Sequence, residues 1–363
     1  MSLSEKIQAI EDEMKRTQVN KRTEHHLGLL KAKLARLKAE QEISKRSRQS
    51  GAGFELKKEG DCTVVLVGPP SVGKSLILNR LTNAKSKVSS YAFTTTTVVP
   101  GLFEHKGARI QVLDLPSVMP GAASETGRGR KVLSVARNAD LIMLVIDVFQ
   151  LDQVDFLRRE LHEVGIRVNA RPPNVTIEKA GQGGLSISTT CTLTKLSAST
   201  ARAVLNAYGI HHGKVVIKED MGDDELIDAV AGNRHYVPAI TVLNKVDLVG
   251  DEYLAEAGKK LRGGFLPISA DRNTNLDELK EVIYNRLNFI RVYLKPRDGE
   301  PDFDAPLIVT AGSTVFNVCV KIHRSFAEEA KYALVSGTSV RFNNQRVGMD
   351  HAVHDGDILT IIR

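Results

Sequence analysis

The sequence contains no tryptophan, and aromatic residues make up only 5% of its 363 residues. Its three cysteines, Cys62, Cys191 and Cys319, are far apart and form no CxxC pair, so neither a disulfide framework nor a cysteine zinc site is expected. The longest clean apolar run, residues 141–146, is far shorter than the roughly 20 residues that cross a bilayer, and the charged N-terminus is unlike a signal peptide. We therefore expect a soluble, cytoplasmic protein with no membrane partner.

The composition is that of a folded protein with an uneven distribution of charge. Hydrophobic residues make up 42% and charged residues 26%, which excludes wholesale disorder, and the length predicts two or three domains. The net charge of +7 is concentrated between Lys15 and Arg48, which hold eleven basic and three acidic residues. Apolar residues repeat there every three or four positions and predict two amphipathic helices. A solvated helical hairpin and an RNA-binding arm both remain open.

A phosphate-binding loop follows a short strand pattern at residues 63–67. The segment from Gly68 to Ser75 reads G-x-x-x-x-G-K-S, and a helical pattern comes after it. In such a loop the backbone N–H groups surround the phosphates, Lys74 supplies positive charge and Ser75 binds Mg²⁺. We therefore expect the nucleotide to contact Gly68, Pro69, Pro70, Ser71, Val72, Gly73, Lys74, Ser75 and Leu76.

Four later apolar segments are each followed directly by polar residues. In parallel sheets that bind nucleotides, the ligand-binding residues likewise follow the carboxyl ends of the strands. They are residues 110–113 before Asp114, 141–146 before Asp147, 239–243 before Asn244-Lys245-Val246-Asp247, and 266–268 before Ser269-Ala270. Asp114 is placed to hold the Mg²⁺ shell. Each fragment alone is consistent with a surface turn, but four in this order predict a doubly wound α/β nucleotide-binding domain.

The last two segments predict that the base is guanine. The Asp247 carboxylate can accept two hydrogen bonds from the N1–H and the exocyclic amine of guanine, which adenine does not offer in that arrangement. We expect the stem of Lys245 to cover the base, Asn244 to brace the phosphate loop, and the backbone of Ser269 and Ala270 to donate to guanine O6. GTP or GDP is therefore favoured over ATP.

Five segments distributed along the chain carry a further likeness: Thr23–Lys33, Tyr91-Ala92-Phe93-Thr94-Thr95-Thr96-Thr97, Asp114-Leu115-Pro116, Gly127-Arg128-Gly129-Arg130 and Val135–Leu141. With these segments the sequence resembles, over nearly its full length, the Obg superfamily of translation-factor-related GTPases, and within it the developmentally regulated GTP-binding protein family of archaea and eukaryotes.

The accessory regions agree with this resemblance. Between the segments 141–146 and 239–243, a hairpin of residues 174–178 and 185–193, a helix at 199–207, a strand at 214–218 and a helix at 223–231 are expected, and this ββαβα unit is similar to the family's insert. The C-terminal part resembles a TGS domain, a β-grasp module. The predicted organisation is a basic helical hairpin at 1–50, a P-loop GTPase domain at 60–166 and 238–288, an inserted domain at 167–237 and a TGS domain at 289–363.

The resemblance also implies two switch segments. Thr94 to Thr97 form the first, with Thr95 closing on Mg²⁺ and Thr94 or Thr96 as alternatives, and Asp114 begins the second. Lys74, Thr95 and Asp114 are thus the implied catalytic residues, and Ser75, Thr95 and Asp114 the metal ligands. The sequence departs from the family pattern at Ser117, which replaces a glycine. Val118 stands where small GTPases place a water-orienting glutamine, so intrinsic hydrolysis should be slow.

Three further predictions concern K⁺ activation, arginine fingers and a second metal site. Some relatives use a K⁺ ion held partly by an asparagine of the phosphate loop, and this chain has Ser71 at that position, so activation by K⁺ stays open. Arg128 and Arg130 could act as arginine fingers, but ion pairing or a partner contact is favoured. His351 and His354 could suggest a metal site, but a turn with solvated polar residues is favoured because no helix is predicted to align them.

The sequence therefore predicts a GTP hydrolase that transfers a phosphoryl group to water and acts as a Mg²⁺-dependent switch. Its expected ligands are GTP and GDP, and its expected partners are the ribosome with its rRNA, or tRNA, together with a regulatory protein. The alternative is a nucleotide-sensing, RNA-binding scaffold with negligible turnover, which the Ser117 replacement favours.

Overall fold

The computed structural model describes residues 3–18, 20, 23–48, 59–82, 91–93, 96–119, 121–122, 128–261 and 264–363. The chain divides into two compact units, Met1–Glu55 with Ala170–Tyr236, and Leu56–Asn169 with Val237–Arg363. This division is coarser than the four predicted segments, whose boundaries remain a prediction. Thr94, Thr95 and the side chains of Arg128 and Arg130 lie outside the described part.

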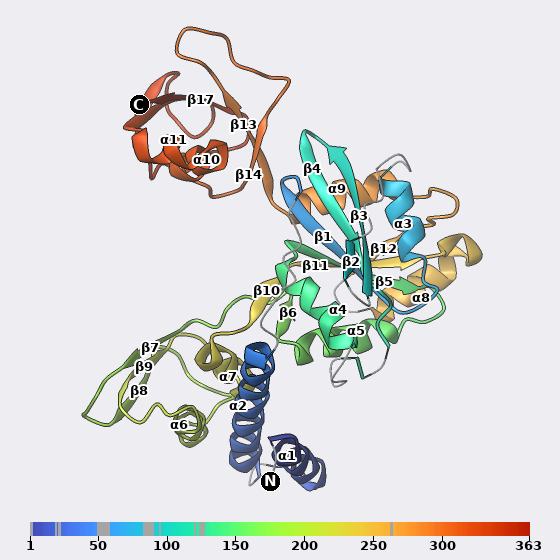
Figure 1. Ribbon diagram of the computed structural model, residues 1–363, viewed down its shortest axis with the longest axis vertical. Helices are drawn as coiled ribbons and strands as arrows, with labels where there is room; N and C mark the ends of the chain where they lie inside the picture. Colours follow the sequence, from blue (N-terminus) through green and yellow to red (C-terminus); the bar gives the residue numbers. More distant parts are fainter. Residues whose placement is uncertain are drawn as a thin grey trace. The chain divides into compact units, whose positions relative to one another are not determined.

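The second unit is built on a seven-stranded sheet in the order β12-β11-β5-β1-β4-β3-β2 (Figure 1). The five strands from β12 to β4 are parallel, and β3 and β2 form an antiparallel edge. β1 and β11 are buried along their whole length because helices cover both faces of a parallel sheet. The strands are β1 (Cys62–Val67), β2 (Tyr91–Phe93), β3 (Thr96–His105), β4 (Ala108–Asp114), β5 (Leu141–Asp147), β11 (Ala239–Asn244) and β12 (Leu266–Pro267).

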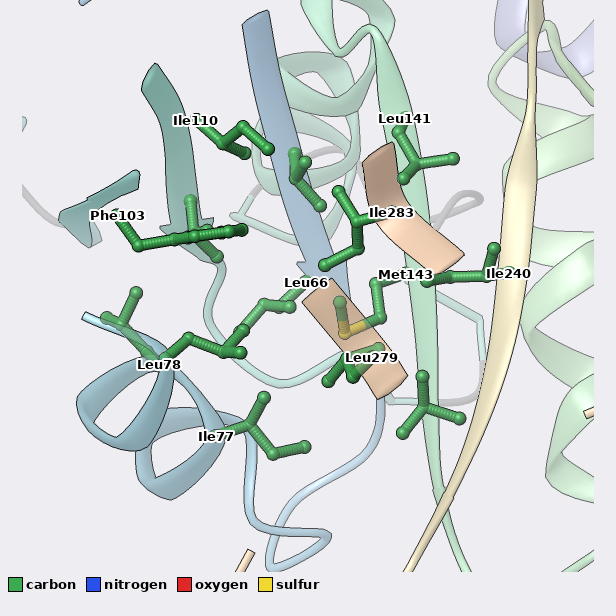
Figure 2. Packing of buried hydrophobic residues seen from close by; sticks show 14 of the residues in the cluster. Leu66, Ile77, Leu78, Phe103, Ile110, Leu141, Met143, Ile240, Leu279 and Ile283 are labelled. Carbon is green, nitrogen blue, oxygen red and sulfur yellow. The ribbon is translucent and has the colours of Figure 1, made fainter. Parts of the chain in front are cut away.

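Helices α3 and α9 cover one face of this sheet. Figure 2 shows Ile77 and Leu78 of α3 and Leu279 and Ile283 of α9 packed with strand residues such as Met143. These side chains are almost fully buried, and this packing fixes the start of α3 directly after the phosphate loop. The helices of this domain are α3 (Lys74–Leu81), α4 (Arg128–Val135), α5 (Gln153–Glu163), α8 (Asp251–Lys260) and α9 (Leu276–Arg286).

The C-terminal segment forms a separate five-stranded sheet in the order β14-β13-β17-β15-β16. In this sheet β13 pairs with β17 in parallel, and α10 begins at a Thr314 cap whose hydroxyl accepts from the Asn317 amide. The elements are β13 (Phe289–Leu294), β14 (Leu307–Thr310), α10 (Val315–Ile322), α11 (Arg324–Glu329), β15 (Tyr332–Ser336), β16 (Gln345–Val347) and β17 (Asp357–Ile362). Within the described residues no group of three His, Cys, Asp or Glu side chains could hold a metal ion.

The first unit contains the N-terminal helices and the inserted segment. Its elements are α1 (Leu3–Arg16), α2 (Glu24–Arg48), β7 (Val175–Lys179), β8 (Leu185–Thr189), α6 (Ala198–Ala207), β9 (Gly213–Ile217) and α7 (Asp223–Ala231). Two further strands at the boundaries of the division, β6 (Ile166–Val168) and β10 (His235–Val237), form a short separate sheet. Among these described helices and those above, none is long and apolar enough to cross a membrane.

The predicted hairpin between residues 174–178 and 185–193 is wrong. The order of the insert sheet is β7-β9-β8, with β9 antiparallel to β7 and parallel to β8. Val215 and Ile217 of β9 are completely buried, whereas the apolar residues of β7 and β8 are only half-buried. The most apolar strand therefore occupies the centre, which separates the two strands that are neighbours in sequence.

The basic N-terminal arm packs within this unit instead of standing alone. Ala32 of α2 is fully buried in one cluster with the apolar residues of α6 and α7. The Lys31 ammonium lies 3.2 Å from Asp223 and 3.0 Å from Asp224 at the start of α7, and Lys38 lies 3.0 Å from a carboxylate of α1. Two of the arm's basic residues, Lys31 and Lys38, thus form ion pairs within this unit.

Candidate nucleotide site

The loop between β1 and α3 has a backbone that requires glycine at two positions. Gly73 has a φ of +91°, and a Cβ there would lie 2.4 Å from Asn244 Nδ2. A Cβ on Gly68 would lie 2.3 Å from the carbonyl oxygen of Val145 in β5. Ser71 also has positive φ, at 63°. The loop therefore curls tightly over the end of the sheet, the shape in which successive backbone N–H groups can surround a phosphate.

The Lys74 ammonium is folded back onto this loop. It donates to the carbonyl of Gly68 at 3.0 Å, to that of Pro69 at 2.8 Å and to the hydroxyl of Ser117 at 3.1 Å. Lys74 is only 7% exposed, and this burial lowers its pKa although the nearby Asp114 opposes the shift. A buried cation at the first turn of α3 is placed to attract phosphate oxygens.

Ser75 and Asp114 meet beside Lys74. The Ser75 hydroxyl donates to Asp114 Oδ2 at 2.5 Å, while Asp114 Oδ1 is buried with no hydrogen-bond partner among the described residues. Burial raises the pKa of Asp114, although the Ser75 hydrogen bond and Lys74 act in the opposite direction. A hydroxyl and an unsatisfied buried carboxylate oxygen form a donor set that fits Mg²⁺, which seeks oxygen ligands.

Asn244 joins the two ends of the site. Its Nδ2 donates to the carbonyl of Val72 in the phosphate loop at 2.8 Å, and its Oδ1 accepts from the amide of Ala270 at 3.1 Å. The side chain is 2% exposed, so both bonds are shielded from water. The phosphate loop and the loop after β12 are therefore positioned by one amide, and the bracing hydrogen bond predicted for Asn244 is present.

The predicted base-reading residues follow β11. Lys245 has a φ of 68°, and its ammonium lies 2.6 Å from the carboxylate of Asp147 at the end of β5. Hydrogen bonding from the Ser269 hydroxyl, assisted by Arg272, holds the pKa of Asp247 below its usual value. Arg272 Nε lies 3.6 Å from Asp247 Oδ2. Asp247 is thus kept ionised, the form that accepts hydrogen bonds with both oxygens.

The loop after β12 is fixed more tightly than the sequence suggested. Ser269 is fully buried and exchanges backbone hydrogen bonds with Thr274 at 3.2 and 2.9 Å. Arg80 at the end of α3 donates to the carbonyls of Ala270 and Asp271, both at 3.2 Å. Arg80 was not among the predicted site residues, because a lone arginine in a helix carries no signal by which it could be found. The Ala270 amide is already used by Asn244, so guanine O6 would share that donor.

The segment after Asp114, which is predicted to be the second switch, is attached to β1 and to the phosphate loop. The amide of Val118 donates to the carbonyl of Gly68 at 3.1 Å, and that of Leu115 to Leu66 at 3.4 Å. Val118 is 2% exposed, so this position presents neither a polar group nor an open face. Thr95 lies outside the described residues, and its predicted role stays a prediction, as do the ligand contacts of the other predicted site residues.

Comparison with known families identifies three consecutive segments of the chain between residues 63 and 363. Residues 63–179 match a family described as "50S ribosome-binding GTPase", residues 182–289 match the C-terminal region that follows this GTPase domain, and residues 290–363 match the TGS domain. The predicted P-loop GTPase fold, its inserted region and the C-terminal TGS domain are therefore confirmed.

Relatives are similar over the full length. An uncharacterized GTP-binding protein of Methanocaldococcus jannaschii is 49% identical, covering 100% of this chain and 93% of that protein. GTP-binding protein 1 of Schizosaccharomyces pombe is 45% identical (100% and 99%), and developmentally-regulated GTP-binding protein 2 of Homo sapiens is 43% identical (100% and 100%). The chain therefore belongs to the developmentally regulated GTP-binding protein family, as a GTP-binding protein with a P-loop GTPase domain and a TGS domain.

Proposed function

We propose that the protein is a Mg²⁺-dependent GTP hydrolase with slow intrinsic turnover that acts as a switch on the ribosome or its RNA. The observation that carries this proposal is the Asn244 side chain, whose two hydrogen bonds hold the phosphate loop and the base loop in one site. A ligand that spans both loops must have a phosphate tail and a base. The lowered pKa of Asp247 favours guanine, because an ionised carboxylate accepts the N1–H and the amine.

The chemistry would be supplied by positioning and charge. Lys74 would bind the β- and γ-phosphate oxygens, and the loop N–H groups would hold the phosphates in place. Ser75 and Asp114 would hold Mg²⁺. When bound, this ion would neutralise part of the negative charge on the phosphoryl group that is transferred. The buried, apolar Val118 offers no side-chain group to orient a water molecule, which supports slow hydrolysis.

The partner is proposed from the family and from the accessory modules. The GTPase segment matches a family described as ribosome-binding, and the N-terminal arm retains exposed cations such as Lys15, Arg16 and Lys33 that suit a phosphate backbone. GTP would order the switch segments, hydrolysis would release them, and the accessory modules would transmit the state to RNA.

Phosphate release measured with and without ribosomes tests the proposal. We expect slow release by the protein alone and faster release when ribosomes are added. The second candidate function, a nucleotide-sensing scaffold, is favoured by Ser117, and it predicts retained GTP affinity with no stimulated hydrolysis. Running the assay in KCl and in NaCl decides the K⁺ question, since equal turnover would remove K⁺ as an activator.

A further inference from the structure

The contacts of Lys74 single out Ser117. An ammonium group has three N–H donors, and in this structure each has an acceptor: Gly68 O, Pro69 O and Ser117 Oγ. Two acceptors are carbonyls of the phosphate loop itself. Ser117 is the single partner from elsewhere in the described structure, and its 3.1 Å distance is the longest of the three.

Ser117 lies in a segment that is attached on both sides. Leu115 and Val118 are 1% and 2% exposed, and their amides bond to Leu66 and Gly68. Ser117 itself is exposed, so its hydroxyl can leave Lys74 by rotating its side chain without uncovering apolar surface. A phosphate oxygen is a charged acceptor and forms a stronger hydrogen bond with an ammonium than a hydroxyl does.

We propose that the Ser117 hydroxyl is a positioning group that competes with nucleotide phosphate for the Lys74 ammonium. Without nucleotide, the hydrogen bond holds Lys74 on its own loop and fastens the second switch segment to it. A phosphate that reaches Lys74 displaces the hydroxyl and frees the switch segment from this bond. Ser117 thus couples phosphate occupancy to the second switch, a consequence that rests on the proposed nucleotide site.

The test compares Ser117→Ala with Ser117→Thr, which keeps a hydroxyl, and with Ser188→Ala, an exposed serine of β8. Calorimetry is done with GDP and with a non-hydrolysable GTP analogue in the presence of Mg²⁺. Because the alanine removes the competing acceptor, we expect both nucleotides to bind about three- to tenfold more tightly to Ser117→Ala. Ser117→Thr and Ser188→Ala should bind as the wild type does.

A second readout does not depend on affinity. Without nucleotide, the Val118 amide of Ser117→Ala should exchange its hydrogen faster than in the wild type, and with GDP bound the two should be equal. Unchanged or weaker nucleotide binding by Ser117→Ala, together with unchanged exchange, would overturn the competition. A wild type that binds neither nucleotide would instead defeat the proposed nucleotide site, so the two failures are distinguishable.

Discussion

Asp114 ends β4 and Asp247 follows β11 of the same sheet, yet their pKa values are shifted in opposite directions. Asp114 is buried beside the phosphate loop, where burial raises its pKa and one of its oxygens has no partner among the described residues. Asp247, at the proposed base-reading end, receives a hydrogen bond from Ser269 that lowers its pKa. Asp247 therefore has its partners, Ser269 and Arg272, within the protein, whereas one oxygen of Asp114 is left for a ligand.

This difference assigns separate tasks to the two ends. A pre-ionised Asp247, held by a fully buried serine, can discriminate between bases without rearrangement. Asp114 and Lys74 are both shifted toward their neutral forms by burial, so the arrival of a cation and of phosphate would change the electrostatics of this end most. We expect specificity to reside at Asp247 and switching to reside around Asp114.

The largest effect is expected from Asp247→Asn. The amide removes one acceptor for guanine and adds a donor that suits the 2-carbonyl of xanthine. We expect affinity for GDP to fall between about 10²- and 10⁴-fold and affinity for xanthosine diphosphate to rise. Calorimetry with both nucleotides measures this change. If the variant kept its preference for guanine, Asp247 would not be the base-reading residue.

Asn244→Ala should break the link between the two ends. Removing the amide leaves the carbonyl of Val72 and the amide of Ala270 unpaired in a buried place, each at a cost of about 1–3 kcal/mol. We expect a lower melting temperature without nucleotide and at least tenfold weaker GDP binding, measured by calorimetry and thermal unfolding. Asn275→Ala, which removes a more exposed bond to the Pro267 carbonyl, is the matched control and should leave GDP binding unchanged.

A pH series sharpens the comparison at Asp114. Its raised pKa means that the folded state holds its proton above pH 3.8, so without Mg²⁺ its contribution to stability falls as pH rises from 3.8 through the folded pKa. Mg²⁺ requires the deprotonated carboxylate. We therefore expect apparent Mg²⁺ affinity, measured by calorimetric titration of Mg²⁺ into the GDP-bound protein at each pH, to increase with pH across that window and then level off.

Asp114→Asn is the control for this series. Its Mg²⁺ affinity should be weaker at every pH and should lose that part of the pH dependence. A wild-type profile that is flat from pH 4 to pH 7 would show that the Asp114 carboxylate does not limit Mg²⁺ binding.

The smallest effect is expected from Glu281→Gln. Glu281 is a carboxylate of α9 that belongs neither to the phosphate end nor to the base end of the site. Glu281 lies 2.5 Å from Lys106 and 2.9 Å from His105, and these hydrogen bonds lower its pKa to about 2. Its contribution to stability is full above pH 4.5 and is lost as pH falls toward 2. The variant should melt slightly below the wild type at pH 7, and the difference should shrink below pH 4.5. GDP binding should not change; an altered affinity would contradict its separation from the site.

The sequence predicted those parts of the site that depend on local order. The spacing of Gly68, Gly73 and Lys74 after a strand fixes the phosphate loop, and the polar residues that follow β4, β11 and β12 must meet at one edge of a parallel sheet. The strands ending at Asp114 and Asn244, and the helix after the loop, are where the patterns predicted them.

The features that could not be predicted are contacts between residues that are far apart in the sequence but close together in the folded chain. The pairing of β9 between β7 and β8 is a non-local choice that neighbouring strands in the sequence do not reveal. The packing of Ala32 against the inserted helices, the Arg80 bonds to the loop after β12 and the Ser117 bond to Lys74 all join residues far apart in the chain. The opposite pKa shifts of Asp114 and Asp247 also depend on burial and on hydrogen-bond partners. Both residues are aspartates, so the residue type alone does not distinguish them.

We infer that one site reads guanine at Asp247 and holds phosphate at Lys74. Calorimetry of the wild-type protein with GDP and with ADP, in the same Mg²⁺ buffer, is the decisive experiment for this inference. We expect tight binding of GDP, and binding of ADP that is weaker by a factor of about 10³ or more. Equal affinity for the two nucleotides would show that the site does not select guanine.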